Sequence, residues 1–151
     1  MDQPKTYKVF IASPRDVNEE REIALQVIQD INRDLETEGA GYSLEPRTWE
    51  KTYPDIGKAQ SVINKQIPIE ESDIFVGIFW YWFGKPPGLS QRKGAKSYLS
   101  GTEFEIEKAF RARKKNNDSQ RPVIMLYQKM DPLPVSMTYD EYLQFPRVIE
   151  F

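Results

Sequence analysis

The stretch 73-DIFVGIFW-80 is apolar at nearly every position. A strand with one face in water alternates apolar and polar residues, whereas a strand buried on both faces reads as an unbroken apolar run. This stretch therefore predicts a central strand of a parallel sheet. The run 121-RPVIMLYQK-129 has the same character, and it predicts a second buried strand.

A strand and a helix precede this central stretch. The β-rich run 7-YKVFIAS-13 ends in turn residues and predicts the first strand. Asp16, with Glu19 three positions later, resembles a capping box and predicts a helix start, and the break at 39–41 predicts the helix end. Apolar residues at every fourth position predict the buried face of this helix, and they are Ile23, Val27, Ile31 and Leu35.

The rest of the chain continues the alternation. Residues 42–49 predict an edge strand because Pro46 cannot donate a hydrogen bond, and a short helix is expected over about 57–67. Residues 84–100 are rich in Gly, Pro and Ser and predict a long loop. A further helix is expected over roughly 101–116, with its core side formed by Ile106, Ala109 and Phe110.

This order of strands and helices predicts an α/β fold. Right-handed crossovers between parallel strands give a flavodoxin-like, three-layer sandwich with a mainly parallel sheet of four to five strands. Ligands bind such sheets at the carboxyl ends of the strands, beside the switch in strand order. The sequence places three segments at that rim: Ser13 to Asp16, Trp80 to Gly84, and the start of the helix that carries Glu103 and Glu105.

Composition narrows the chemistry. The chain has 151 residues, which suits a single domain, and a formal net charge of -2, which argues against nucleic-acid binding. It has no Cys and no His, so Cys or His zinc sites and Ser-His-Asp triads are excluded. No apolar run reaches the length of a membrane span and no signal peptide is recognisable, so we expect a cytoplasmic protein that binds no membrane. The apolar end of the tail 139-YDEYLQFPRVIEF-151 suggests a domain of a longer protein.

Three carboxylates occupy five positions in 100-SGTEFEIEKAF-110. Acidic residues favour the first turn of a helix because they complement its positive end, so none of the three requires a function. The helical wheel places Glu103 and Glu105 at the borders of the core side, and it pairs Glu107 with Arg111 on the surface. Two candidates for a functional carboxylate therefore remain on periodicity alone.

A family resemblance separates them. The stretches 7-YKVFIASPRDVNEERE-22, 73-DIFVGIFWYWFG-84 and 100-SGTEFEIEKAF-110, followed by 122-PVIMLYQ-128, resemble a family of bacterial domains at the N-termini of STAND-type signalling NTPases. That family is similar to TIR domains and, more distantly, to nucleoside deoxyribosyltransferases. The resemblance implies that a Glu in this helix performs N-glycosidic chemistry, and Gly101-Thr102, Glu105-Ile106 and Ala109 match the pattern around it. Deoxyribosyltransferases have a Gly where Glu107 stands, and the turn after the first strand, SPRDV, differs from the usual TIR loop.

The resemblance implies an effector domain in signalling or anti-phage defence that cleaves NAD or a related nucleotide with Glu105 as the catalytic residue. No metal and no cofactor are expected, and NAD would be a substrate. The expected substrate-binding residues are Ser13, Arg15, Asp16, Trp80, Trp82, Gly101 and Thr102. Loop cations are more often simply solvated, which is the alternative for Arg15, and aromatic residues such as Trp80, Trp82 and Phe83 more often serve in packing.

Two other functions remain open at this point. The chain resembles modules that associate with each other and with the C-terminal domains of a parent protein, in which case the 84–100 loop and an exposed Phe104 would form contacts. It would alternatively serve as a nucleotide sensor that binds without turnover.

Overall fold

The computed structural model describes residues 3–48, 69–81 and 101–139, and the fold is given for these ranges. The elements are β1 (Lys5–Ala12), η1 (Arg15–Val17), α1 (Asn18–Thr37), β2 (Tyr42–Arg47), η2 (Ile69–Glu71), β3 (Ile74–Phe79), α4 (Gly101–Lys115) and β4 (Val123–Gln128). The expected helix at 57–67, the 84–100 loop, Trp82 and the tail lie outside the described residues.

The described strands form one four-stranded sheet in the order β2-β1-β3-β4, and every neighbouring pair is parallel. This order places β2 and β4 at the edges and puts the switch in strand order between β1 and β3. The edge position of β2 fits Pro46, which pairs with Val9 without donating to a ladder. The prediction of a flavodoxin-like α/β fold is confirmed.

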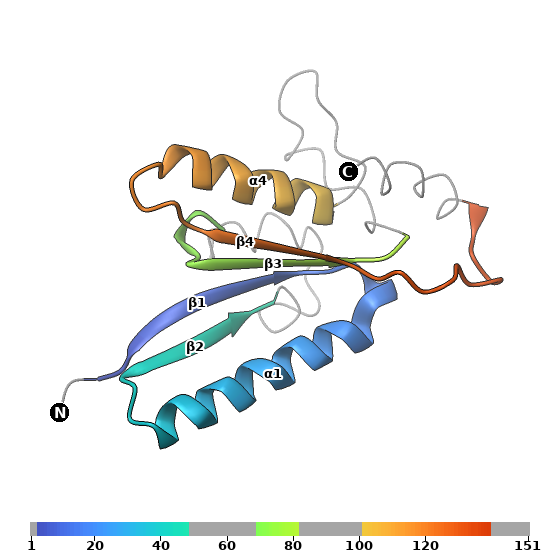
Figure 1. Ribbon diagram of the computed structural model, residues 1–151. Helices are drawn as coiled ribbons and strands as arrows, with labels where there is room; N and C mark the ends of the chain where they lie inside the picture. The colour runs from blue at the N-terminus through green and yellow to red at the C-terminus, as the bar shows by residue number, and fades with distance from the viewer. Residues whose placement is uncertain (1–2, 49–68, 82–100, 140–151) are drawn as a thin grey trace, which may run out of the picture.

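The two long helices lie on opposite faces of the sheet (Figure 1). On the α4 side, Phe10, Phe75 and Phe79 join Ile106 and Ala109 in one buried cluster. Residues of opposite parity on the same strands, such as Ile11 and Ile78, pack with Leu25 and Ile28 of α1 in a second cluster. The core is therefore two layers of apolar side chains separated by the sheet.

Helix α1 ends as the sequence predicts. Gly39 and Gly41 both have positive φ, and Gly39 and Ala40 donate their N–H groups back to the carbonyls of Glu36 and Leu35. The predicted start is wrong, because the N-cap is Val17 and no side chain caps the helix.

The predicted buried face of α1 is also wrong. The residues at every fourth position that face the sheet are Val17, Arg21 and Leu25, followed by Ile28, and all of them are buried. Ile23, Val27 and Ile31 are exposed. The spacing of four residues is correct, but the prediction selected the wrong row of side chains. The inner row contains the charged Arg21, so the more apolar outer row resembled the buried face.

Helix α4 is rotated relative to the prediction. Ile106 and Ala109 are buried as expected, but Phe110 is 48% exposed, and Ala112, three residues after Ala109, is buried instead. Phe104, expected to be exposed, is buried. Small residues let a helix approach a sheet closely, so Ala112 marks the contact side better than the larger Phe110 does.

Strand β4 exists where predicted, but it is not buried. It pairs with β3 along one edge, and five of its six residues are exposed, with Ile124 intermediate. Among the described residues, no helix is long and apolar enough to cross a membrane.

Candidate functional site

The rim at the carboxyl ends of the strands is where β1 and β3 end and where α4 begins, since α4 runs antiparallel to the strands (Figure 1). Ser13 follows β1 directly and is buried, and Thr102 in the first turn of α4 is buried as well. Hydroxyl groups withdrawn from water at this end of a parallel sheet are of the kind that orient a bound ligand.

Glu105 occupies a core position of α4. It is 2% exposed, and it lies on the same helical row as Ala109 and Ala112, both of which are buried against the sheet. Carboxylates are almost never fully buried unless they have partners, and Glu105 does engage in an interaction within the protein. A residue type that normally seeks water is thus held inside the fold, one turn from the end of α4 that lies at this rim.

The two neighbouring acids differ from each other. Glu103 is fully buried, whereas the side chain of Glu107 is partly exposed and pairs with Arg111 at 3.3 Å. The expected surface pair Glu107–Arg111 is therefore confirmed. Thr102 to Ile106 are five successive buried residues in the first turns of α4.

An arginine that the sequence analysis did not select belongs to this rim. Arg21 of α1 is 4% exposed, and its Nη1 donates to Ser13 Oγ at 3.4 Å while Nη2 donates to Asn18 Oδ1. The signal was present in the sequence, because Arg21 lies midway between Val17 and Leu25 on the inner row of α1. A charged residue in an otherwise apolar row of a helix indicates a functional or structural role more strongly than a charged residue on an exposed loop does.

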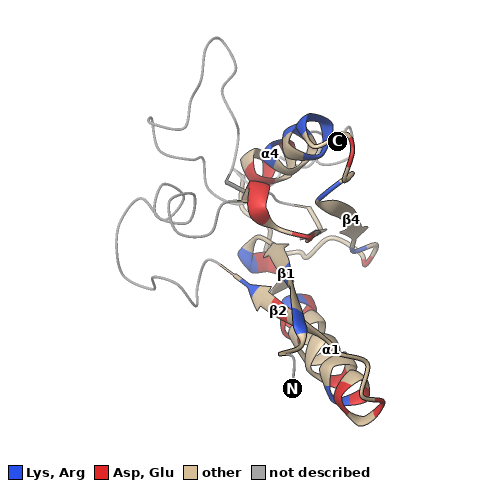
Figure 2. Ribbon diagram, turned by 90° about the vertical axis from the view of Figure 1, so that its left-hand side faces the viewer, with Lys and Arg blue, Asp and Glu red and all other residues tan. Residues whose placement is uncertain are grey.

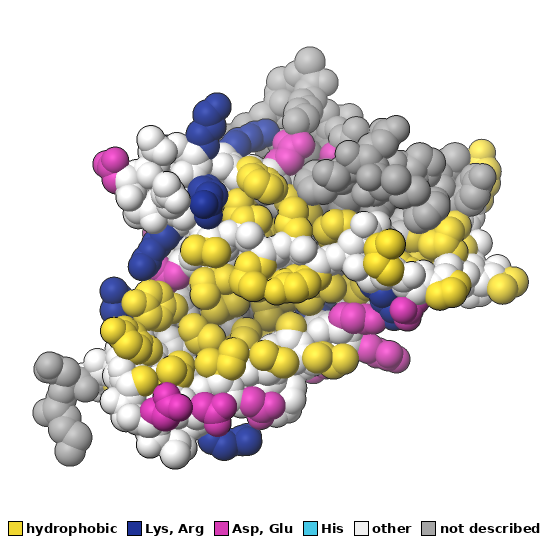
Figure 3. Space-filling view, in the orientation of Figure 1, with side chains coloured by type: hydrophobic (Ala, Val, Ile, Leu, Met, Phe, Trp, Pro, Cys, Tyr) yellow, Lys and Arg dark blue, Asp and Glu magenta, His cyan; other side chains and the backbone are white. Residues whose placement is uncertain are grey.

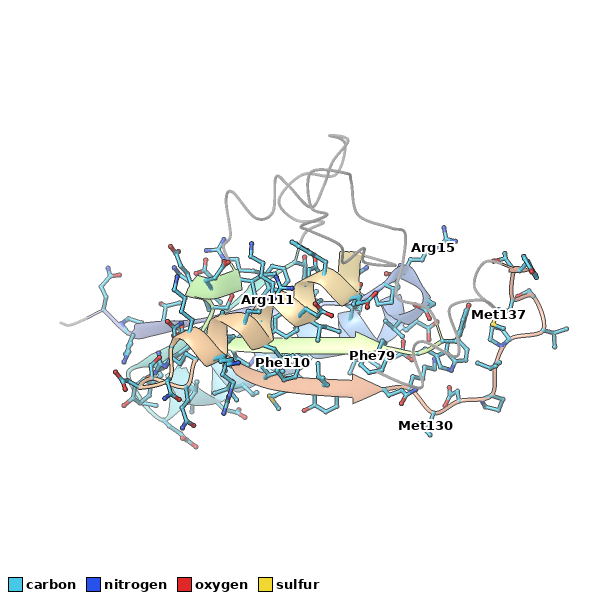
Figure 4. The ribbon with its side chains drawn as sticks, turned by 90° about the horizontal axis from the view of Figure 1, so that it is seen from above. Arg15, Phe79, Phe110, Arg111, Met130 and Met137 are labelled. Carbon is cyan, nitrogen blue, oxygen red and sulfur yellow. The ribbon has the colours of Figure 1, made fainter. Side chains whose placement is uncertain are left out.

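The remaining predicted residues are distributed around this centre. Arg15 is exposed and projects outward at the carboxyl-terminal end of the sheet (Figure 4), and Asp16 beside it has both carboxylate oxygens buried. Gly101 is the first residue of α4. The structure therefore brings Ser13 together with Arg21, and it keeps Arg15 at the surface.

Trp80 lies on the other side of the sheet from α4. It packs against the cluster that contains Ile78 and Leu25, and its indole N–H donates to the carbonyl of Asp131 at 2.9 Å. The Lys129 ammonium lies 4.6 Å from the Trp80 ring centroid, which is a cation–π distance. This placement assigns Trp80 to packing on the α1 side.

Lys129 also connects β4 to α1. Its Nζ lies 2.5 Å from Glu20 Oε1 and 3.5 Å from Asp131 Oδ2. The hydrogen bond from Lys129 lowers the pKa of Glu20 below its ordinary value, and the same bond raises the pKa of Lys129. The ion pair thus joins the first turn of α1 to the end of β4 at the rim.

Nothing among the described residues groups three or more metal-ligating side chains. No family model matches the chain, and no curated protein matches it significantly.

Proposed function

We propose that the protein cleaves the N-glycosidic bond of NAD or a related nucleotide, with Glu105 as the catalytic carboxylate. The observation that carries this proposal is a carboxylate only 2% exposed near the carboxyl ends of the strands. Glu103 is buried as well, and the family pattern around Glu105-Ile106 and Ala109 selects Glu105. A position that would suit a Leu or an Ala is occupied by an acid, and natural sequences accept such conflicts mainly at functional sites.

The reaction suits a protein that has neither His nor Cys. When the bond between the ribose C1′ and the nicotinamide nitrogen breaks, its electron pair neutralises the pyridinium, and nicotinamide leaves as a neutral base without a general acid. A carboxylate stabilises the positive charge that develops on the ribose, or forms a covalent ester with C1′. Water then adds to C1′ and releases one proton.

Burial strengthens this role of Glu105. A carboxylate held in a site of low dielectric interacts more strongly with a developing cation than it would in water. Ser13 and Arg21 add a hydroxyl and a guanidinium at the end of β1. A guanidinium recognises phosphate or carboxylate groups, which fits a dinucleotide substrate. In this proposal, Arg15 is the exposed cation that meets the substrate first.

The test measures nicotinamide release from NAD by the wild-type chain and by Glu105→Gln, which preserves the shape of the side chain and removes its charge. We expect a loss of about 100-fold or more, the usual size of a catalytic carboxylate effect. Glu103→Gln and Glu107→Gln are the matched controls, because each alters an acid of the same helix. Release that is the same in wild type and Glu105→Gln would refute the assignment.

A nucleotide sensor is distinguished by binding without turnover. Thermal unfolding with and without NAD measures binding directly, because a ligand that binds only the folded state raises its stability in proportion to occupancy. A rise in the unfolding temperature without nicotinamide release identifies a sensor. In that case, Glu105→Gln would change the shift of the unfolding temperature caused by NAD, and neither wild type nor variant would release nicotinamide.

A further inference from the structure

The sheet face on the α1 side is only half covered. Helix α1 packs over β2, over β1 and, through the cluster that contains Ile78, over part of β3, whereas the same face of β4 bears no described helix, and an apolar surface extends across it (Figure 3). In the parallel register, Val123, Met125 and Tyr127 pair with Ile74, Val76 and Ile78, so the side chains of both strands point to this face. All three β4 residues are exposed.

The apolar outer row of α1 extends the same surface. Ile23, Val27 and Ile31 follow one another at every fourth position and are 62%, 48% and 39% exposed. Together these side chains define what we call the α1/β4 face. Its members are Ile23, Val27, Ile31, Val123, Met125 and Tyr127.

The size of this face fits the centre of a protein interface. Fully burying one large aliphatic side chain removes roughly 60–120 Å² of apolar area from water, since it is worth about 1.5–3 kcal/mol at about 25 cal/mol per Å². Six half-exposed side chains therefore offer roughly 200–350 Å². A standard interface buries about 800 Å² per partner, somewhat over half of it apolar, so the α1/β4 face supplies about half of the apolar area required.

The position of the face beside α1 suits a second copy of the chain. Helix α1 lies on this side of the sheet (Figure 1), and the apolar surface continues beside it toward β4 (Figure 3). A twofold axis parallel to the strands would place α1 of each copy over the exposed β4 side chains of the other. Each sheet would then be covered on both faces, as parallel sheets are, and the contact would be isologous.

The charges at the borders are complementary in the same arrangement. The sequence of α1 contains six acidic and two basic residues, and acidic side chains line the border of the face on the α1 side (Figure 3). Basic residues gather in the last turn of α4, at Arg113, Lys114 and Lys115 (Figure 2). The twofold rotation brings the acidic border of one copy to the basic border of the other, which favours association.

We propose that the α1/β4 face binds a second copy of this chain in a symmetric dimer. The evidence for this proposal is separate from the evidence for the glycosidic activity, because the members of the face are residues of α1 and β4 and none of them is a predicted site residue. The proposed contact also differs from the contacts expected from the sequence, since Phe104 is buried.

Sedimentation of the full chain over a range of concentrations measures the association. We expect the mass to rise from 17.7 kDa toward twice that value at micromolar concentrations. Val27→Glu and Met125→Glu should each weaken the dimer more than tenfold, because each places a charge inside the apolar contact. Phe110→Glu and Val135→Glu are the matched controls, since both residues are exposed and apolar but lie outside the face.

Cross-linking gives a second measurement that does not depend on disrupting the contact. The chain has no Cys, so two single variants, Val27→Cys and Met125→Cys, can be mixed and oxidised without background. We expect a covalent dimer that joins the two variants and forms faster than when Phe110→Cys replaces Met125→Cys. A monomer at all concentrations, equal effects of face and control substitutions, or equal cross-linking rates would overturn the proposal.

Discussion

The orientation of α4 determines whether Glu105 lies inside the fold, and a pair of substitutions tests it. Ile106 is fully buried, and its Cδ1 lies 3.7 Å from the position that a Cβ on Gly77 would take. Ile106→Ala removes three carbon atoms. At about 0.8 kcal/mol each, the lost burial costs roughly 2.4 kcal/mol, and the cavity left beside Gly77 raises the total to about 3–4 kcal/mol.

Phe110→Ala is the control, because the sequence pattern predicted the same buried role for Phe110. A buried Phe→Ala costs about 3–5 kcal/mol, but Phe110 is 48% exposed and leaves no closed cavity, so we expect a cost of about 1 kcal/mol. The free energy of unfolding is measured by urea denaturation followed by far-UV circular dichroism. If Phe110→Ala cost as much as Ile106→Ala, α4 would be rotated from the orientation described here, and the burial of Glu105 would lose its basis.

Three further predictions concern single positions: Gly77, Gly39 and Glu20. A Cβ on Gly77 would meet Leu126 Cδ2 at 2.7 Å, but Leu126 lies on an edge strand and its side chain can rotate away. Gly77→Ala should therefore lower the free energy of unfolding, measured by urea denaturation, by less than about 1 kcal/mol, whereas Gly77→Leu should displace α4 and lower it by more than about 2 kcal/mol. Gly39→Ala should cost about 1 kcal/mol although nothing lies within 4 Å, because φ is +64° there, and an unchanged stability would contradict that conformation. Glu20→Gln should lower the thermal unfolding midpoint at neutral pH. Lys129 lowers the pKa of Glu20 from 4.5, so the ion pair stabilises the fold above that pH, and this stabilisation is lost as the pH falls through the lower folded-state pKa. The unfolding midpoints of wild type and variant should therefore become equal in acid. A difference in midpoint that stays constant with pH would exclude the ion pair as the cause.

The existence and order of the elements could be predicted because the signals are local. The unbroken apolar run of β3, the glycines after α1 and the Pro in β2 each act through backbone geometry or hydrogen bonding within a few residues. These signals gave the sheet and its class. They also placed Glu105 on a helix next to the rim, but not inside the fold.

The faces of the helices could not be predicted with the same rule. Periodicity finds a row of side chains, and counting large apolar residues then chooses the wrong row when the inner row contains Arg21 or Ala112. Both residues are inside for reasons that the count ignores: Arg21 donates to Ser13 across the start of the helix, and Ala112 allows close approach to the sheet. Tertiary contacts, and not the pattern, decide between the two rows.

Strand β4 shows that an apolar run in the sequence does not by itself mean that the strand is buried within the chain. Its apolar run is as continuous as that of β3, yet most of its residues are exposed in the described part of the chain. An apolar run predicts that a strand is built to be covered, but it does not say which molecule provides the cover. The exposure of β4 is therefore consistent with its sequence once a second copy of the chain is considered as the partner.

Helix α1 connects the two proposals. Its inner row carries Arg21, which donates to Ser13 at the rim, and its outer row forms half of the α1/β4 face. The first turn of α1 is also joined to the end of β4 by the Glu20–Lys129 pair. A partner that packs on the outer row would restrain α1, and through Arg21 it would restrain the hydroxyl of Ser13. Association at the α1/β4 face, as proposed, would in this way act on the rim through α1, without any contact between the partner and Glu105.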